Sequence, residues 1–222
     1  MTRTIRSFLA VLTLACAPLL AAASAEEGAD KAPVPPEEIA RATVEKVLDA
    51  MEGRRDELRR NPEELDAIIE RILVPLVDVE YMSRLVLGRH WREASDAQRE
   101  RFQEAFKDML IQTYGGALLE FDREQVEFMP VRAEESAEDV TFRAKVKTES
   151  GETVDVDLDL HLVDGEWKIY NGSVGNLTFV TNYRGQFNQE IRRTSLETLI
   201  GKLESRYSGT PATAQKDADD TR

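Results

Sequence analysis

The pattern that most restricts how this chain folds is an alternation of apolar and polar residues between positions 139 and 163. Apolar side chains occupy every second position over 140–146 and again over 154–162, and polar or charged side chains fill the positions between them. Because successive side chains of a strand point to opposite faces, the pattern predicts two strands that share one apolar face. The Ser150–Gly151 pair predicts the turn of an antiparallel hairpin. Such a hairpin is stable only if other elements cover its apolar face.

Two more strands are expected beside this hairpin. The Asp164–Gly165 pair is a second turn signal, and residues 167–174 after it predict a third strand. Residues 126–129 predict a strand ahead of the hairpin. Together these segments indicate a meander of consecutive antiparallel strands.

Helical periodicity governs the segments before and after the sheet. Apolar residues recur at a spacing of about 3.6 over 36–51, 62–72, 78–88 and 95–119, and one long helix is expected from about residue 178 to 203. This order predicts an α+β fold in which helices pack over one face of a curved antiparallel sheet.

The helix at 95–119 carries the clearest local signals. Ser95 and Gln98 have the spacing of a capping box, which predicts the start of the helix. Gly115 and Gly116 are costly inside a helix and indicate a kink or close packing there.

The first 25 residues have the composition of a secretory signal peptide. Arg3 and Arg6 precede the uncharged apolar run 8–20, and an Ala-Ser-Ala sequence ends at Ala25. The run is shorter than the roughly 20 residues that cross a bilayer as a helix. We therefore expect cleavage after Ala25 and export to the periplasm, and Cys16, the only cysteine, lies in the removed segment.

The remaining sequence divides into three parts. Residues 26–36 are polar and proline-rich and predict a flexible leader. Residues 37–205 have the length of a single domain, and residues 206–222 predict a disordered tail.

The charge balance excludes one class of partner. The chain has 29 Lys and Arg against 42 Asp and Glu, a net charge of −13. A phosphate footprint needs clustered basic residues, so nucleic acid or an anionic bilayer surface is not expected as the main partner.

The sequence offers few catalytic or metal-binding groups. Asp155, Asp157 and Asp159 share the polar phase of one strand, where a solvated face opposite Arg143 and the lysines beside it is the simplest interpretation. Side chains at i and i+2 of a strand lie about 7 Å apart, too spread to surround one ion.

The two histidines have no catalytic setting either. We expect His161 at the surface, because it shares that polar phase, and His90 as a structural hydrogen-bonding residue in a loop between helices. No nucleophile-elbow, zinc-protease, P-loop or dinucleotide motif is present. We therefore predict no catalytic residue, metal or cofactor.

The predicted inner face of the fold is almost wholly apolar. A purely apolar interior is more often a packed core than a ligand cavity, and the residues alone leave both readings open.

Two blocks of sequence carry a resemblance to a known family. The first is VEYMSRLVLGRHWR at 79–92, followed by the Ser95 cap and the sequence QRERF at 98–102. The second is WKIY at 167–170, followed by VTNYR at 180–184 and apolar positions as far as Leu203. Over about residues 36–204 the chain resembles the MlaC family of periplasmic phospholipid-binding proteins, also called the toluene-tolerance family.

The resemblance implies a carrier that shuttles glycerophospholipid across the periplasm. Its partners would be an outer-membrane lipoprotein–porin complex and an inner-membrane ABC transporter, and its role would be to maintain outer-membrane lipid asymmetry. It also implies a monomer with a strongly curved sheet of the nuclear-transport-factor type. The apolar cavity of this cone would hold the acyl tails of bound phospholipid as cargo.

Within this resemblance, apolar and aromatic residues of the expected inner face are the candidate tail contacts. They are Tyr81, Met82, Leu85, Val86, Phe106, Met109, Leu110, Phe142, Val154, Val156, Leu158, Leu177, Phe179, Val180 and Tyr183. Arg184 could pair with the headgroup phosphate near the cavity mouth, and a structural ion pair is an equal alternative. Each tail contact could equally be an ordinary core residue.

The chain departs from similar proteins at three places. Asn171 and Gly175–Asn176 stand where Asp and Glu-Gly are common, and Thr194–Ser195 replaces a pair that usually includes glycine. These changes bear on the cavity mouth and on the bend of the last helix.

Two other functions remain open. An isomerase or dehydratase on the same cone fold would require an inward Asp or His with a shifted pKa. An envelope adaptor that binds no ligand would have no cavity.

Overall fold

The computed structural model describes residues 35–120, 125–130, 137–147 and 151–208. These residues belong to one compact unit, which spans Ala32 to Arg222. The predicted signal peptide, most of the predicted leader and the chain beyond residue 208 lie outside the described residues, as does Ser150 of the predicted turn.

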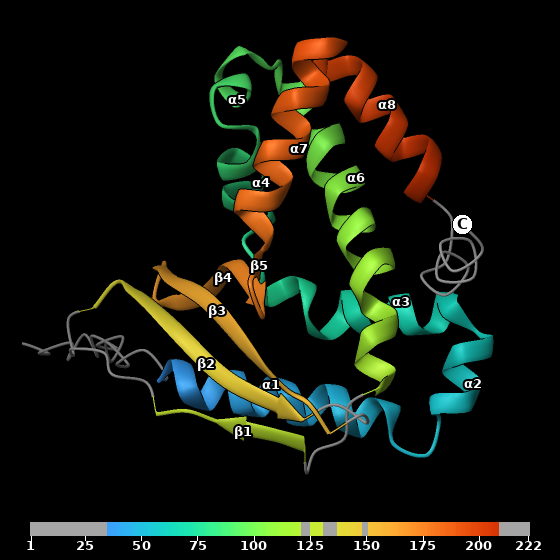
Figure 1. Ribbon diagram of the computed structural model, residues 1–222, viewed down its shortest axis with the longest axis vertical. Coiled ribbons are helices and arrows are strands. Elements are labelled where there is room, and N and C mark those ends of the chain that lie inside the picture. The colour runs from blue at the N-terminus through green and yellow to red at the C-terminus, as the bar shows by residue number, and fades with distance from the viewer. Residues whose placement is uncertain (1–34, 121–124, 131–136, 148–150, 209–222) are drawn as a thin grey trace, which may run out of the picture. The chain divides into compact units, whose positions relative to one another are not determined.

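The described residues contain a five-stranded antiparallel sheet with the strands in sequence order (Figure 1). The strands are β1 (Val126–Phe128), β2 (Asp139–Lys147), β3 (Thr153–Val163), β4 (Glu166–Val174) and β5 (Leu177–Thr178). The predicted meander is therefore confirmed. The sheet is not strongly curled, and the curved cone with its enclosed cavity stays a prediction.

The register of β2 and β3 confirms the predicted faces of the hairpin. Phe142 lies opposite Leu158 and Ala144 opposite Val156, so the apolar phases of both strands share one face. On the other face Lys145 Nζ is 2.7 Å from Asp155 Oδ1. The carboxylates of β3 therefore lie on the polar face, as the alternation predicts, with Asp157 opposite Arg143 and Asp159 opposite Thr141.

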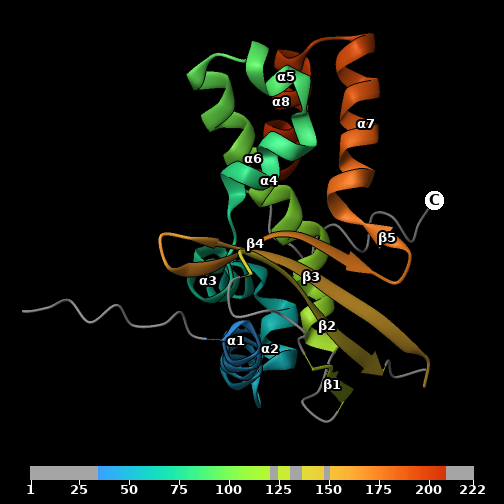
Figure 2. The ribbon, with the colours of Figure 1, turned by 90° about the vertical axis from the view of Figure 1, so that its left-hand side faces the viewer.

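Helices precede and follow the sheet. They are α1 (Pro36–Met51), α2 (Arg55–Arg60), α3 (Pro62–Ile72), the 3₁₀ turn η1 (Val74–Leu76), α4 (Val79–Leu87), α5 (Arg89–Glu93), α6 (Asp96–Tyr114), the 3₁₀ helix η2 (Gly115–Glu120), α7 (Phe179–Arg193) and α8 (Leu196–Tyr207). Figures 1 and 2 show α4 to α8 together at one end of the sheet, while α1 lies along the sheet itself.

Three helical expectations need correction. The long final helix is two helices, because the chain breaks at Thr194 and the Ser195 hydroxyl accepts a hydrogen bond from the Thr198 N–H at 3.0 Å, which caps α8. The helix expected to reach 119 ends at Tyr114 and tightens to 3₁₀ geometry at the glycine pair. His90 lies in the short helix α5 rather than in a loop.

The buried apolar side chains of the described residues form three clusters. The first joins α4, α6, α7 and α8, and in it the rings of Phe102 and Phe106 stack 5.5 Å apart. The second joins α1, α2 and α3 to the end of α6 around Leu65. The third lies between α1 and the sheet and includes Ala40 and Phe142. Helix α6 contributes to the first two clusters and so links the two helical groups.

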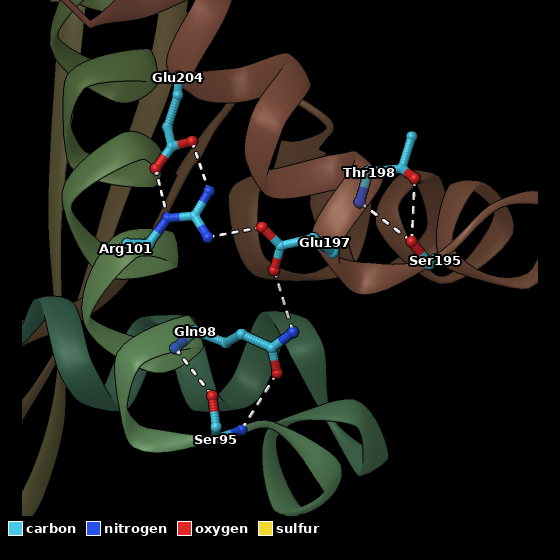
Figure 3. A network of polar contacts seen from close by, with 7 residues as sticks. All are labelled: Ser95, Gln98, Arg101, Ser195, Glu197, Thr198 and Glu204. Carbon is cyan, nitrogen blue, oxygen red and sulfur yellow. Dashed lines mark hydrogen bonds and ion pairs between the residues drawn. The ribbon is translucent and has the colours of Figure 1, made fainter.

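A charged network fastens α6 to α8 at the surface (Figure 3). Arg101 donates to both carboxylate oxygens of Glu204 at 2.8 and 2.7 Å and to Glu197 at 2.6 Å. Gln98 of the capping box donates to the other oxygen of Glu197 at 3.1 Å. The Arg101 guanidinium holds the pKa of Glu197 and of Glu204 below the ordinary value of 4.5.

This network predicts a pH-dependent contribution to stability. A carboxyl whose pKa is lower in the folded chain stabilises the fold above its unfolded pKa, and the effect disappears as pH falls through the folded pKa. Arg101→Gln should therefore lower the melting temperature at neutral pH, and the difference from wild type should shrink below about pH 4. Circular dichroism melts across this range measure it.

The matched control is Arg193→Gln, which removes the same charge from an exposed arginine of α7 outside this network. A constant difference between Arg101→Gln and wild type at all pH values would contradict the prediction.

Candidate functional site

The apolar face of the sheet carries an uncovered patch at one end. Val156 lies opposite Val174 and Val174 opposite Leu177, and Val154 is two positions along the strand from Val156. Directly opposed residues share a face, so these four side chains lie together. We call Val154, Val156, Val174 and Leu177 the apolar end patch.

This patch is the most exposed apolar surface that the structure describes. Val174 is 42% exposed and Leu177 is 40% exposed. They are the only large hydrophobic side chains among the described residues that are exposed to solvent rather than buried or half-buried. Val154 and Val156 are half-buried, and no member of the patch belongs to the three buried clusters. A concentration of exposed apolar side chains at one place is typical of a binding surface.

A glycine on β4 joins this face to the helices. Gly172 lies opposite Leu158, and the ring of Phe179, the first residue of α7, lies directly on it. A Cβ atom at position 172 would be 3.1 Å from the Phe179 ring. Phe179 also packs on Tyr114 of α6, with ring centroids 4.6 Å apart. The apolar end patch therefore continues into aromatic side chains from two helices.

A pair of tyrosine hydroxyls adjoins this aromatic group. The hydroxyls of Tyr114 and Tyr183 are 3.0 Å apart and share one hydrogen bond. Burial, followed by the bond to Tyr114, raises the pKa of Tyr183 well above its ordinary value. The Tyr183 phenol therefore stays neutral at physiological pH, so the boundary between sheet and helices is suited to an uncharged apolar ligand.

Asn171 holds α7 in place on the sheet. Its amide nitrogen donates to Asp159 at 2.8 Å, and its carbonyl oxygen accepts from the backbone N–H of Val180 at 3.1 Å. The Gly175–Asn176 pair forms the turn between β4 and β5, with Gly175 at φ 58°. Asn171 and Gly175–Asn176, two of the three expected departures from similar proteins, therefore lie between the apolar end patch and α7.

The structure divides the predicted tail contacts into three groups. The first group is exposed or half-buried: Val154, Val156, Leu158 and Leu177 are on the strands, and Leu85, Leu110, Phe179 and Val180 are on the helices. Those buried inside the clusters are Met82, Val86, Phe106, Met109, Phe142 and Tyr183. Tyr81 is apart from both groups, because its ring packs on His161 and Tyr170 with centroids 4.7 and 5.3 Å away.

His161 is less exposed than its strand phase predicts. Its side chain is 16% exposed, and its Nε2 is 3.0 Å from Asp78 Oδ2, while Asp78 Oδ1 accepts the Tyr81 N–H and caps α4. The correction has a tertiary cause, since the start of α4 lies against the polar side of β3. His90 fulfils the structural role expected of it, with its Nε2 3.1 Å from Asn188 Oδ1.

Arg184 lies in a groove between α7 and the junction of α4 with α5. The groove has a volume of about 430 Å³ and is lined by Leu87, Gly88, Arg89, Thr181, Arg184, Gly185, Asn188 and Arg192. The structure pairs Arg184 with no carboxylate of the described residues.

Sequence reasoning missed several of these residues. Val174 was not expected at the site, because the register skips Tyr170 between β3 and β4 and the phase of β4 cannot be read through that bulge. Arg89 and Arg192 were missed as well. The four-residue spacing of Arg184, Asn188 and Arg192 was a signal that could have placed the last of these on one helix face.

The described ranges contain neither a metal cluster nor a membrane-spanning helix. No three His, Cys, Asp or Glu side chains among them come together as a metal site. Their helices are all too short or too polar to cross a membrane.

Comparison with known proteins identifies the family. The model of the MlaC protein family matches residues 41–205. The chain belongs to the MlaC family. The toluene tolerance protein ttg2D of Pseudomonas putida is 28% identical over 187 residues, which cover 84% of this chain and 86% of that protein. The intermembrane phospholipid transport system binding protein MlaC of Haemophilus influenzae is 20% identical over 171 residues, 74% of this chain and 78% of that protein.

A solved structure supports the fold of this MlaC-family chain. It is the phospholipid-binding protein of Ralstonia solanacearum in complex with a phospholipid, with a TM-score of 0.69 and 28% sequence identity. The match covers 77% of this chain and 95% of the Ralstonia chain.

The contact between Gly172 and Phe179 predicts the effect of a substitution on stability. Gly172→Val places a side chain where the Phe179 ring lies, and overpacking of this kind costs about 1–3 kcal/mol. Urea denaturation measures the loss. Gly201→Val is the control, because a Cβ atom at position 201 of α8 has open space around it. Gly172→Val stability equal to wild type would show that Phe179 is not fixed on the sheet.

Proposed function

We propose that this protein is a periplasmic carrier of glycerophospholipid. It would move lipid between an outer-membrane lipoprotein–porin complex and an inner-membrane ABC transporter, and so maintain the lipid asymmetry of the outer membrane. The single observation that carries the proposal is the apolar end patch beside Phe179, in a chain of the MlaC family with a relative solved in complex with a phospholipid.

The proposal assigns the acyl tails to the apolar side of the sheet. Val154 and Val156 of the end patch, with Leu158 beside them, would form the wall, and Phe179 would stand at the boundary with the helices. In the loaded protein the sheet would curl around the tails to give the expected cone. The half-buried state of these valines, outside any buried cluster, supports this reading because the tails would supply the missing contacts.

The energetics of burial explain why such a carrier needs partners. Burial of one methylene contributes about 0.8 kcal/mol, so two tails of about 15 methylenes each gain on the order of 24 kcal/mol relative to water. Release into water would be negligible. A bilayer is as dry as a protein interior, so transfer between the two is close to isoenergetic. Lipid should therefore be transferred only where the carrier contacts a membrane complex.

The polar face of the sheet supports a carrier over an enzyme. Asp155, Asp157 and Asp159 have basic or hydroxyl partners on that face, including Lys145 for the first and Thr141 for the last. They are therefore directed away from the apolar face on which a substrate would lie. The predicted signal peptide supports a periplasmic location.

The proposal predicts that phospholipid co-purifies with the protein. Native mass spectrometry of the mature chain from a bacterial periplasm should show near-stoichiometric lipid. Val156→Glu should abolish it, because a buried carboxylate in contact with acyl chains is strongly unfavourable. Leu177→Glu tests the exposed edge of the same patch.

Val163→Glu is the matched control, since Val163 lies on the same strand in the opposite phase. It should leave the bound lipid unchanged. A wild-type protein that carries no lipid and takes none from vesicles, even with its partner complexes present, would overturn the carrier.

A further inference from the structure

The groove that contains Arg184 has a chemistry that phospholipid tails do not use. Arg184 and Arg192 come from α7, and Arg89 comes from α5 across the groove. All three are exposed. We call these three residues and the groove that they line the arginine groove.

The arginines of this groove stand out within an acidic chain. The net charge is −13, and Arg101 and Arg54 each pair with two glutamates. By contrast, no carboxylate of the described residues forms an ion pair with Arg89, Arg184 or Arg192. Three neighbouring cations without carboxylate partners make a local positive surface that favours an anionic ligand.

Two of the three arginines are spaced along helix α7. Arg184 and Arg192 are eight positions apart on one helix, or about 12 Å along its axis. Gly88, at φ 55°, lets the Arg184 guanidinium lie against the backbone of the α4–α5 junction, because a Cβ atom there would be 3.3 Å from its Nη2 atom. On the other side, Arg89 Nε is 3.5 Å from His90 Nε2, which also contacts Asn188.

This spacing favours an extended anion over a compact one. A single phosphate offers its oxygens within a few ångströms, so it could engage one arginine or two adjacent ones. Charges spread over about 12 Å match several carboxylates along a chain better. Thr181 and Asn188 in the lining add hydrogen-bonding groups, which suit a peptide.

We propose that the arginine groove docks an acidic peptide segment of a partner protein. The inference rests on the proposed function in one respect, which is that a carrier must contact its donor and acceptor complexes. The groove shares no residue with the apolar end patch, so docking and cargo binding can be tested separately.

The test uses a fluorescent synthetic peptide of alternating Glu and Ala, with a Gln-for-Glu peptide as its counterpart. Fluorescence anisotropy should show salt-sensitive binding of the Glu peptide to the full mature protein and none of the Gln peptide. The double variant Arg184→Gln with Arg192→Gln should weaken binding by at least about tenfold. The charge-preserving double variant, Arg184→Lys with Arg192→Lys, should retain most of the binding of the Glu peptide.

Arg193→Gln is the matched control, because it removes an arginine from the same helix outside the groove lining. It should bind the Glu peptide like wild type. Circular dichroism melts of every variant show whether it is folded, and the lysine variant keeps the test informative if the glutamine variant is not.

Three results would overturn the proposal. The first is equal binding of the Glu peptide by wild type and the glutamine double variant. The second is loss of co-purified phospholipid from the double variant, which would make the groove a headgroup site. The third is displacement of the peptide by low concentrations of inorganic phosphate, which would make it a single-anion site. If wild type carries no lipid but binds the peptide, the proposed function fails and the docking groove stands.

Discussion

The ring of Phe179 lies against Gly172, at a point where a Cβ atom would be only 3.1 Å from the ring. This contact brings the first residue of α7 onto the apolar face of the sheet. Asn171 adds a polar tie between the same two elements, through Asp159 on one side and the Val180 N–H on the other. The helical core and the sheet are thus joined beside the apolar end patch, so a ligand on that patch would contact both.

Helix α7 carries two different surfaces along its length. Its first residue, Phe179, belongs to the apolar side, while Arg184 and Arg192 face the groove at the α4–α5 junction. The phases of β3 separate polar and apolar groups in the same way, with Asp155 and its lysine partner on one face and Val156 on the other. Under the two proposals, cargo and a protein partner would contact different side chains of α7.

Much of the fold is readable from local patterns. The alternation over 139–163 predicts which residues of β2 and β3 share a face, and Ser95 predicts the start of α6, because both signals act between residues close in the chain. The break at Thr194 was missed, although Ser195 and Thr198 have a capping spacing, because the apolar residues continue at helical spacing on both sides. The apolar spacing indicates which residues are buried, and it does not show where one helix ends and the next begins.

The sequence by itself determined the fold class, the apolar phase of β3 and the family, since periodicity and motif order are properties of the chain alone. Only the tertiary structure decided which side chains meet across long separations. Val174 lies opposite Val156 through a register that skips Tyr170, His161 contacts Asp78, and Arg89 lines the same groove as Arg184. These contacts depend on how whole elements pack against one another. Because the free energy of that packing is shared among many residues far apart in the chain, no local sequence pattern predicts the contacts.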